Sequence, residues 1–292
     1  MDHDQNFKNL ILDYPREALE FFAAPETEGV VEGARIIPLR QEQLKERLGD
    51  RFRELDVPLL VEWPDGRREA LLFVLEEESD ARRFSIHRLA HYCLDLAELC
   101  ETDRVVPVVI FLHGGPSRHE LTLGGHRHTY LQFNYLLCEL PKIPYEDYRS
   151  SNNIVARLNL PNLSYPPVRK VEVYAQAVRG LLTLEPHPER QLKYLDFIDI
   201  YAGLNDNELE QYRREYPEEA AQMATFAERF MQQGMQQGMQ QGEAAVLLRL
   251  MECKFKEVPE EVRQRVKEAD PQTLLEWSAR LLTADTIDAV FH

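Results

Sequence analysis

Asp56, Glu76 and Glu78 are the residues of this sequence whose types and spacing best suit chemistry. Side chains alternate between the two faces of a strand, so Glu76 and Glu78 share a face of any strand that contains both. Crowded carboxylates raise one another's pKa, and a hard, oxygen-seeking cation such as Mg²⁺ removes that cost. A Mg²⁺ ion also polarises a phosphoryl oxygen and lowers the pKa of a bound water. The chemistry that these residues predict is therefore phosphodiester hydrolysis.

A β-hairpin would bring these carboxylates together. The apolar segments 57–63 and 69–75 flank a Pro-Asp-Gly sequence, which is a strong turn signal. With residues 64–68 as the loop, paired positions sum to 132, and Asp56 lies opposite Glu76. Cross-strand partners share a face, with Cβ atoms about 4.5 to 5.5 Å apart. A solvated acidic strand end is the alternative interpretation, because runs of charge are usually exposed.

Helices and further strands must position this hairpin. The expected elements are an amphipathic helix over 7–22 interrupted or restarted at Pro15, a short helix over 41–48, a helix over 84–99, a buried strand over 105–112, a further strand over 130–139, and helices after Val168. A helix, two strands, a helix and a strand in this order favour an α/β core with a mixed sheet.

The composition predicts three parts along the chain. Residues 1–204 form the α/β domain with a helical extension, 205–243 an acidic and low-complexity spacer, and 244–292 a small all-α module. The spacer repeats Met-Gln-Gln-Gly with a period of four. A helix of this sequence could align its methionines into a contact surface between two chains. Glycine costs up to about 1 kcal/mol relative to alanine in a helix, so we expect a partly helical spacer instead. Apolar residues at helical spacing before and after Pro259 predict three helices in the module.

Overall composition limits the partners. The chain has 50 acidic and 34 basic residues, for a net charge of -16, which argues against broad affinity for nucleic acid. Four dispersed cysteines, without C-x-x-C spacing, suggest neither a zinc site nor disulfides and favour a reducing cytoplasm. Charged residues throughout 1–20 oppose a signal peptide, and the most apolar stretch, 105–112, is far shorter than the roughly 20 residues of a membrane span. We expect a soluble, cytoplasmic protein that does not bind membranes.

The hairpin resembles the nuclease core of the recombination-promoting nuclease (Rpn) or transposase-like family, which belongs to the PD-(D/E)XK superfamily. The resemblance is carried by Leu55-Asp56-Val57-Pro58, Leu72-Phe73-Val74-Leu75-Glu76-Glu77-Glu78-Ser79, His3-Asp4-Gln5-Asn6-Phe7-Lys8, the helix over 84–92 and the strand over 106–112. It covers roughly the first two-thirds of the chain and implies a restriction-endonuclease-like core, a mixed sheet flanked by helices. The C-terminal module resembles a helical domain of unknown function that is often appended to such proteins.

The resemblance implies roles for the hairpin carboxylates. Asp56 and Glu76 match the motif Asp and Glu, which would both be metal ligands, and the backbone carbonyl of Glu77 would be a third ligand. The implied cofactor is Mg²⁺, with Mn²⁺ or Ca²⁺ as substitutes. Glu78 occupies the position usually held by Lys, or by Gln in many Rpn-like proteins, which orients the attacking water. In this chain, Glu78 would either accept a proton from that water or add a metal ligand.

Residues on two helices complete the site that the resemblance implies. An acidic residue on the first helix often joins such sites, and Glu17 or Glu20 would be this accessory acid or else a solvated helix residue. Arg88 and Tyr92 lie four residues apart on one helix face. They would either contact the scissile phosphate or pack beneath the sheet.

A local basic patch would reconcile the acidic chain with a DNA substrate. The arginines expected to flank the site on both sides are Arg67, Arg68, Arg82 and Arg83. A second group of basic residues lies among glycines and predicts an ordinary polar loop, with contact to DNA phosphates as the alternative: His113, Arg118, His119, His126, Arg127 and His128.

The function expected from the resemblance is a metal-dependent DNA endonuclease, linked to DNA recombination, mobility or phage defence. DNA is the expected partner, and we expect a homo-oligomer. A catalytically degenerate protein that binds DNA or protein without cleavage is the alternative. A third hypothesis is an assembly protein, in which the spacer and the C-terminal module organise oligomers.

Overall fold

The computed structural model describes residues 3–27, 33–39, 57–76, 84–114, 119–284 and 286–291. Contacts divide the chain into two units, Met1–Glu219 and Ala220–His292. The three-part division expected from composition stays a prediction. The helix expected over 41–48 lies outside the described residues. Within the described chain, no helix is long and apolar enough to cross a membrane.

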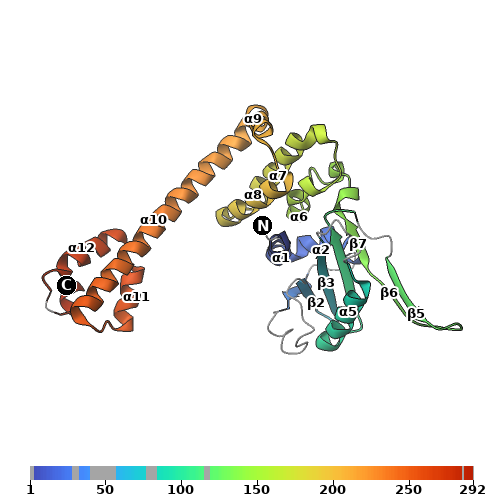
Figure 1. The fold of residues 1–292 in the computed structure, drawn as a ribbon, viewed down its shortest axis with the longest axis horizontal. Helices are drawn as coiled ribbons and strands as arrows, with labels where there is room; N and C mark the ends of the chain where they lie inside the picture. The colour runs from blue at the N-terminus through green and yellow to red at the C-terminus, as the bar shows by residue number, and fades with distance from the viewer. Residues whose placement is uncertain are drawn as a thin grey trace. The chain divides into compact units, whose positions relative to one another are not determined.

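The first unit combines a sheet with helices (Figure 1). Its strands are β1 (Arg35–Pro38), β2 (Val57–Glu62), β3 (Arg68–Glu76), β4 (Val105–Phe111), β5 (Glu120–Gly124), β6 (Thr129–Asn134) and β7 (Leu136–Glu139). Its helices are α1 (His3–Asp13), α2 (Pro15–Phe22), α3 (Ala24–Thr27), α5 (Ile86–Cys100), α6 (Ile154–Leu158), α7 (Lys170–Leu184), α8 (Pro188–Ala202) and α9 (Asp206–Glu215). The helix α10 (Pro217–Phe255) begins in this unit.

Five strands form one mixed sheet in the order β1-β2-β3-β4-β7. The first three strands pair antiparallel, whereas β3 pairs parallel with β4 and β4 parallel with β7. A parallel pair needs a crossover connection, and α5 lies in the connection from β3 to β4. The predicted α/β core with a mixed sheet is therefore confirmed.

The β2–β3 hairpin is confirmed, but its register differs from the prediction. Val57 pairs with Phe73 and Glu62 with Arg68, so paired positions sum to 130, not 132. The cause is a shorter loop: the Trp63 N–H donates to the Arg67 carbonyl at 3.0 Å, which leaves three residues in the loop. Gly66 has a φ of 84°, the left-handed conformation that ends such three-residue loops. The predicted register, with paired positions that sum to 132, was therefore wrong over residues 57–62, and Asp56, whose pairing with Glu76 was derived from it, lies outside the described residues.

The strand expected over 130–139 is divided between two sheets. β6 pairs with β5 in a separate two-stranded sheet, and β7 joins the main sheet beside β4. Tyr135 lies between β6 and β7, buried, with its ring centroid 5.3 Å from that of Phe84. This buried ring fixes the chain where it passes from one sheet to the other. The polar loop expected around residues 119–128 contains β5.

Helices cover both faces of the main sheet. On one face, Leu89 and Tyr92 of α5 pack with Val109 and Phe111 of β4. On the other face, the Phe22 ring of α2 contacts Phe73 of β3, with ring centroids 6.3 Å apart. The predicted N-terminal helix is confirmed as α1 and α2, with Pro15 in the first turn of α2, where its missing N–H leaves no bond unmade.

The helical extension, α6 to α9, packs against the N-terminal helices. The rings of Phe7 and Phe197 lie 5.4 Å apart. Glu185, whose side chain is 2% exposed, accepts hydrogen bonds from the Tyr14 hydroxyl and from the His187 N–H, the latter at 2.8 Å. Burial raises the pKa of Glu185, but these hydrogen bonds outweigh it, and the net pKa lies below the ordinary value of 4.5. The carboxylate therefore joins α2 to the α7–α8 connection in its charged form.

Glu185→Gln should lower the free energy of unfolding by about 2 kcal/mol at pH 7, because the buried Tyr14 hydroxyl and the backbone N–H of the exposed His187 lose their charged acceptor. A lowered native pKa contributes stability that is full above pH 4.5 and is lost as the pH falls through the native pKa. The wild-type chain should thus lose more stability than Glu185→Gln between pH 6 and pH 3. Urea titrations at several pH values measure this, with the exposed Glu189→Gln as control. Parallel pH profiles of wild type and Glu185→Gln would contradict the assignment.

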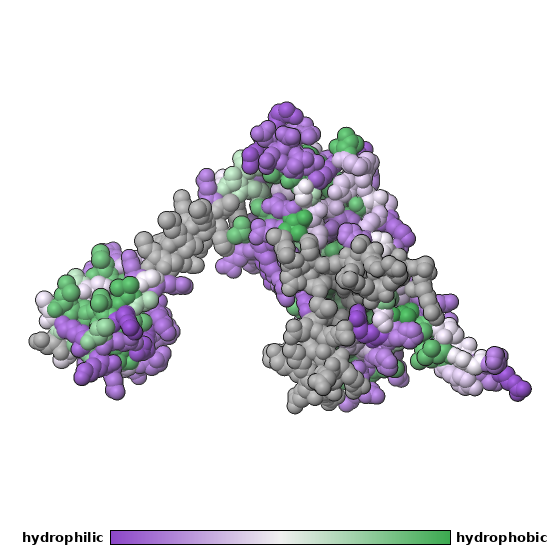
Figure 2. Space-filling model, viewed as in Figure 1, coloured by the Kyte–Doolittle hydropathy of each residue, from purple (hydrophilic) through white to green (hydrophobic). Residues whose placement is uncertain are grey.

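The second unit is mostly helical. After α10 it contains α11 (Glu260–Glu268), α12 (Pro271–Leu281) and α13 (Asp288–Phe291). Its core includes Leu247, Val266, Trp277 and Phe291. The three predicted helices, on either side of Pro259, are confirmed. Figure 2 shows hydrophobic residues on the surface of this unit, whose exposed large aliphatic side chains are Val246, Leu250, Leu275 and Leu282.

The Met-Gln-Gln-Gly run is more helical than expected, since it lies entirely within α10. Each glycine costs up to about 1 kcal/mol relative to alanine. Extending an existing helix is easier than nucleating one, and helical sequence continues on both sides of the run. The cooperativity of a long helix thus outweighs the local propensity on which the prediction rested.

Candidate active site

The hairpin end that was predicted to hold a metal is described in part. Asp56, Glu77, Glu78, Arg82 and Arg83 lie outside the described residues. Glu76 is the last residue of β3, and its strand position is known. Val57, the first residue of β2, pairs with Phe73, so Glu76 lies three positions past that pair.

Glu76 lies at the edge of the sheet where α5 begins. Its register partner in β4 is Phe111, which is 1% exposed. The ring of Phe111 contacts that of Phe84, just before α5, with centroids 5.8 Å apart. The carboxyl ends of β3 and β4 and the first turn of α5 therefore meet at one place.

Tyr92 packs beneath the sheet. Its side chain is 8% exposed and belongs to the core that α5 forms with Leu72 and Val109. Arg88, one turn earlier, is half-buried, and its backbone N–H donates to the Ser85 hydroxyl at 3.3 Å, which caps α5. Arg88 thus lies in the first turn of α5, which begins at the Glu76 edge, and Tyr92 lies one turn further along the helix. Their contact with a scissile phosphate stays a prediction.

Arg67 and Arg68 lie at the opposite end of β3 from Glu76. Eight residue steps of a strand separate Arg68 from Glu76, a span of about 26 Å. Both arginines also have acidic partners: Arg67 lies 2.7 Å from Asp65, and Arg68 lies 3.3 Å from Glu62. The structure does not bring this pair to the hairpin end that carries Glu76, because the strand that separates them is extended.

Glu17 and Glu20 lie on α2, which covers the opposite face of the sheet from α5. Glu20 is exposed, and Glu17 is half-buried. The Glu17 carbonyl accepts a hydrogen bond from the Asn153 side chain at 2.8 Å, which ties α2 to the start of α6. Phe22, at the end of the same helix, reaches β3 at Phe73. The helix therefore approaches β3 within three residues of Glu76.

Glu139 is an acidic residue at this edge that the sequence did not single out. In β7 it pairs with Phe111, which pairs in turn with Glu76, so the two glutamates occupy one row across three strands. Neighbouring strands lie about 4.8 Å apart, which separates their backbones by about 10 Å. The Glu139 side chain is 12% exposed and lies 2.6 Å from the Lys142 Nζ. The sequence signal that could have identified Glu139 was its position directly after Cys138, at the end of an apolar segment.

The donor chemistry of the proposed ligands fits a hard cation. Two carboxylates, from Asp56 and Glu76, and the Glu77 carbonyl offer only oxygen, which Mg²⁺ prefers. In the part of the chain that the structure describes, no group of three or more His, Cys, Asp or Glu side chains could hold a metal ion. A metal centre at the hairpin thus depends on residues of the undescribed segments together with Glu76.

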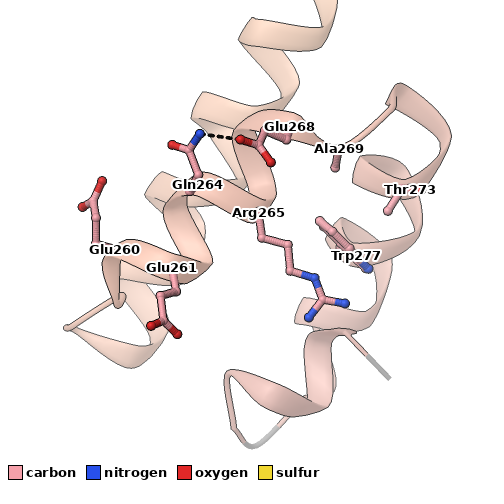
Figure 3. Close-up of a pocket in the computed structure, with 8 residues that line it drawn as sticks. All are labelled: Glu260, Glu261, Gln264, Arg265, Glu268, Ala269, Thr273 and Trp277. Atoms are coloured by element: carbon pink, nitrogen blue, oxygen red, sulfur yellow. Dashed lines mark hydrogen bonds between the residues drawn. The ribbon is translucent and has the colours of Figure 1, made fainter.

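A groove in the second unit lies between α11 and α12 (Figure 3). The Arg265 guanidinium crosses it toward Trp277, at 5.5 Å from the indole ring centroid, and lies 4.6 Å from that of Phe291. Glutamates, among them Glu260 and Glu268, line its outer part. Arg265 is engaged by two aromatic rings, so we assign this groove a structural role in joining the helices.

Comparisons with protein-family models, with curated proteins and with solved structures find no match to this chain. The class is defined by the fold: an α/β protein with a five-stranded mixed sheet and helices, followed by a mostly helical C-terminal region.

Proposed function

We propose that the chain is a metal-dependent DNA endonuclease with a PD-(D/E)XK core, similar to the recombination-promoting nucleases. The proposal is supported above all by the order of elements around Glu76. An N-terminal helix precedes three antiparallel strands, and α5 then leads to the parallel strand β4. Glu76 ends the third of these strands, beside the first turn of α5. This is the position that the resemblance assigns to the motif glutamate.

The proposed chemistry follows from the oxygen ligands. Asp56, Glu76 and the Glu77 carbonyl would hold Mg²⁺, which supplies a Lewis acid for the phosphoryl oxygen and lowers the pKa of a bound water. Glu78 accepts a proton from the attacking water or adds a ligand. Its carboxylate cannot supply the positive charge of the usual lysine, so the charge at the phosphate must come from the metal or from arginines such as Arg88.

Cleavage of supercoiled plasmid by the purified full-length chain tests the proposal. We expect nicked or linear DNA in Mg²⁺ or Mn²⁺ and intact plasmid when EDTA is added. No cleavage with any divalent cation would reject the endonuclease proposal.

The second candidate is a catalytically degenerate protein of the same fold, which binds DNA or protein without cutting. The arrangement of Arg67 and Arg68 favours it, since both arginines have acidic partners and lie far from Glu76. Glu78 in place of lysine favours it also. Calorimetric binding of Mn²⁺ without turnover of plasmid would support this candidate over the endonuclease.

A further inference from the structure

The β5–β6 arm, residues 120–134, is a two-stranded hairpin that extends away from the main sheet (Figure 1). Its strands pair antiparallel from Glu120 opposite Asn134 to Gly124 opposite Thr129. At the tip, the Gly125 N–H donates to the His128 carbonyl at 2.9 Å, so the chain reverses over His126 and Arg127. A Cβ on Gly124 would lie 2.7 Å from that carbonyl oxygen, which explains glycine at this position.

The base of the arm is anchored and its outer part is free. Leu121 is 3% exposed and packs in the core beneath α5, with its cross-strand partner Phe133 partly buried against the same core. From residue 122 to residue 130, in contrast, every residue is exposed. Tyr130 is 79% exposed. An isolated two-stranded hairpin is marginally stable in water, so the anchored base is what holds the arm in shape.

The outer arm differs in charge from the rest of the chain. The protein has 50 acidic residues among 292, yet residues 121–138 contain none. The tip carries Arg127 between His126 and His128, and Figure 2 shows the far end of the arm as hydrophilic. The His128 ring lies beside that of Tyr130, with centroids 6.3 Å apart. An outer arm without carboxylates, with a basic tip and an exposed aromatic ring, is complementary to a polyanion.

The anchor places the arm at the edge where Glu76 lies. The chain enters the arm after β4 and leaves it through Tyr135, whose ring contacts Phe84. Phe84 also contacts Phe111, the register partner of Glu76. The base of the arm and the proposed active site therefore share one group of aromatic residues.

We propose that the β5–β6 arm binds duplex DNA beside the proposed active site, with its tip in a groove and Arg127 on the phosphates. The choice of DNA as the polyanion rests on the proposed endonuclease function. The evidence that the arm binds a polyanion is the charge of the arm, which does not depend on that function. The major groove of B-DNA admits a two-stranded β-ribbon. A second copy of the chain is the less favoured occupant, because the tip has no acidic residue with which a second, identical tip could pair. The arm supplies the positive contact that Arg67 and Arg68, at the far end of β3, do not bring to this edge.

Binding of a fluorescein-labelled 20-base-pair duplex, in EDTA, tests the inference by fluorescence anisotropy. The full-length variants are the triple substitution His126→Gln, Arg127→Gln and His128→Gln, and separately Tyr130→Ser. We expect the triple variant to bind the duplex with about tenfold weaker affinity. A plot of the logarithm of its association constant against the logarithm of the salt concentration should be less steep by about 0.9, the change expected when one phosphate contact is lost. Arg249→Gln removes an arginine that is 81% exposed in the second unit, and it should bind as wild type does.

The outcomes separate this inference from the proposed function. Weakened duplex binding by the arm variants supports the arm even if the wild type never cuts plasmid. Unchanged binding by both arm variants, or no duplex binding by the wild type, overturns it. It is equally overturned if the variants lose affinity only for single-stranded DNA, or if light scattering shows that they lose a dimer while duplex binding stays intact. Circular dichroism confirms that each variant is folded.

Discussion

Asp56→Asn and Glu76→Gln should each reduce the rate of Mg²⁺-dependent plasmid cleavage by about a thousandfold or more. Each substitution removes a charged ligand and keeps the size of the side chain. A metal contributes several kcal/mol of transition-state stabilisation, and every 1.36 kcal/mol corresponds to a factor of about ten in rate. Because the loss is electrostatic, the variants should fold as the wild type does. Initial rates of supercoiled plasmid loss, at saturating metal, measure the effect.

Asp65→Asn is the matched control for these variants. Asp65 is an exposed carboxylate of the same hairpin, in the loop at the other end of β3, where its partner is Arg67 at 2.7 Å. The Asp65→Asn variant should cleave plasmid at the wild-type rate. Cleavage by Glu76→Gln at the wild-type rate would mean that the metal, if any, is held elsewhere.

Trp277→Ala should unfold most of the second unit. Trp277 is 7% exposed, and its ring meets that of Phe291 edge to face at 4.7 Å, with Arg265 over both rings. Truncation of a buried tryptophan costs about 3 to 5 kcal/mol, which is close to the whole stability of a small unit. The last helices, α11 to α13, lose their common contact when the indole is removed. Hydrogen exchange read by mass spectrometry should show lost amide protection across α11 and α12.

Leu275→Ala is the control on the same helix, since Leu275 is 70% exposed. It should leave the exchange pattern of α12 unchanged. If Trp277→Ala retains wild-type protection in α11 and α12, then Trp277 does not hold these helices together. Protection in α5 should be the same in all three proteins, because α5 belongs to the first unit.

The strands of the main hairpin were predictable because two apolar segments flank a turn signal, whereas their register was not. Register depends on loop length, and the sequence Pro64-Asp65-Gly66 is compatible with loops of three or five residues. The left-handed Gly66 selects the shorter one. The shift by two positions leaves each residue on its predicted face, because side chains alternate with a period of two.

The first strand of the arm, β5, and its pairing with β6 were missed for a different reason. Strand prediction depends on alternation between a buried and an exposed face, and from residue 122 to residue 130 both faces of this hairpin are exposed. Its glycines and histidines therefore indicated a loop. Glu139 escaped notice because only the pairing of β4 with β7 places it in one row with Glu76. Such rows arise from tertiary pairing, which local sequence does not encode.

A crystal of the full-length chain soaked in Mn²⁺, with diffraction recorded at the manganese absorption edge, tests the metal centre most directly. We predict one anomalous peak at about 2.2 Å from carboxylate oxygens of both Asp56 and Glu76, the distance of an oxygen ligand. A peak bound to other residues, or no peak when Mn²⁺ is present at saturating concentration, would contradict the proposed site.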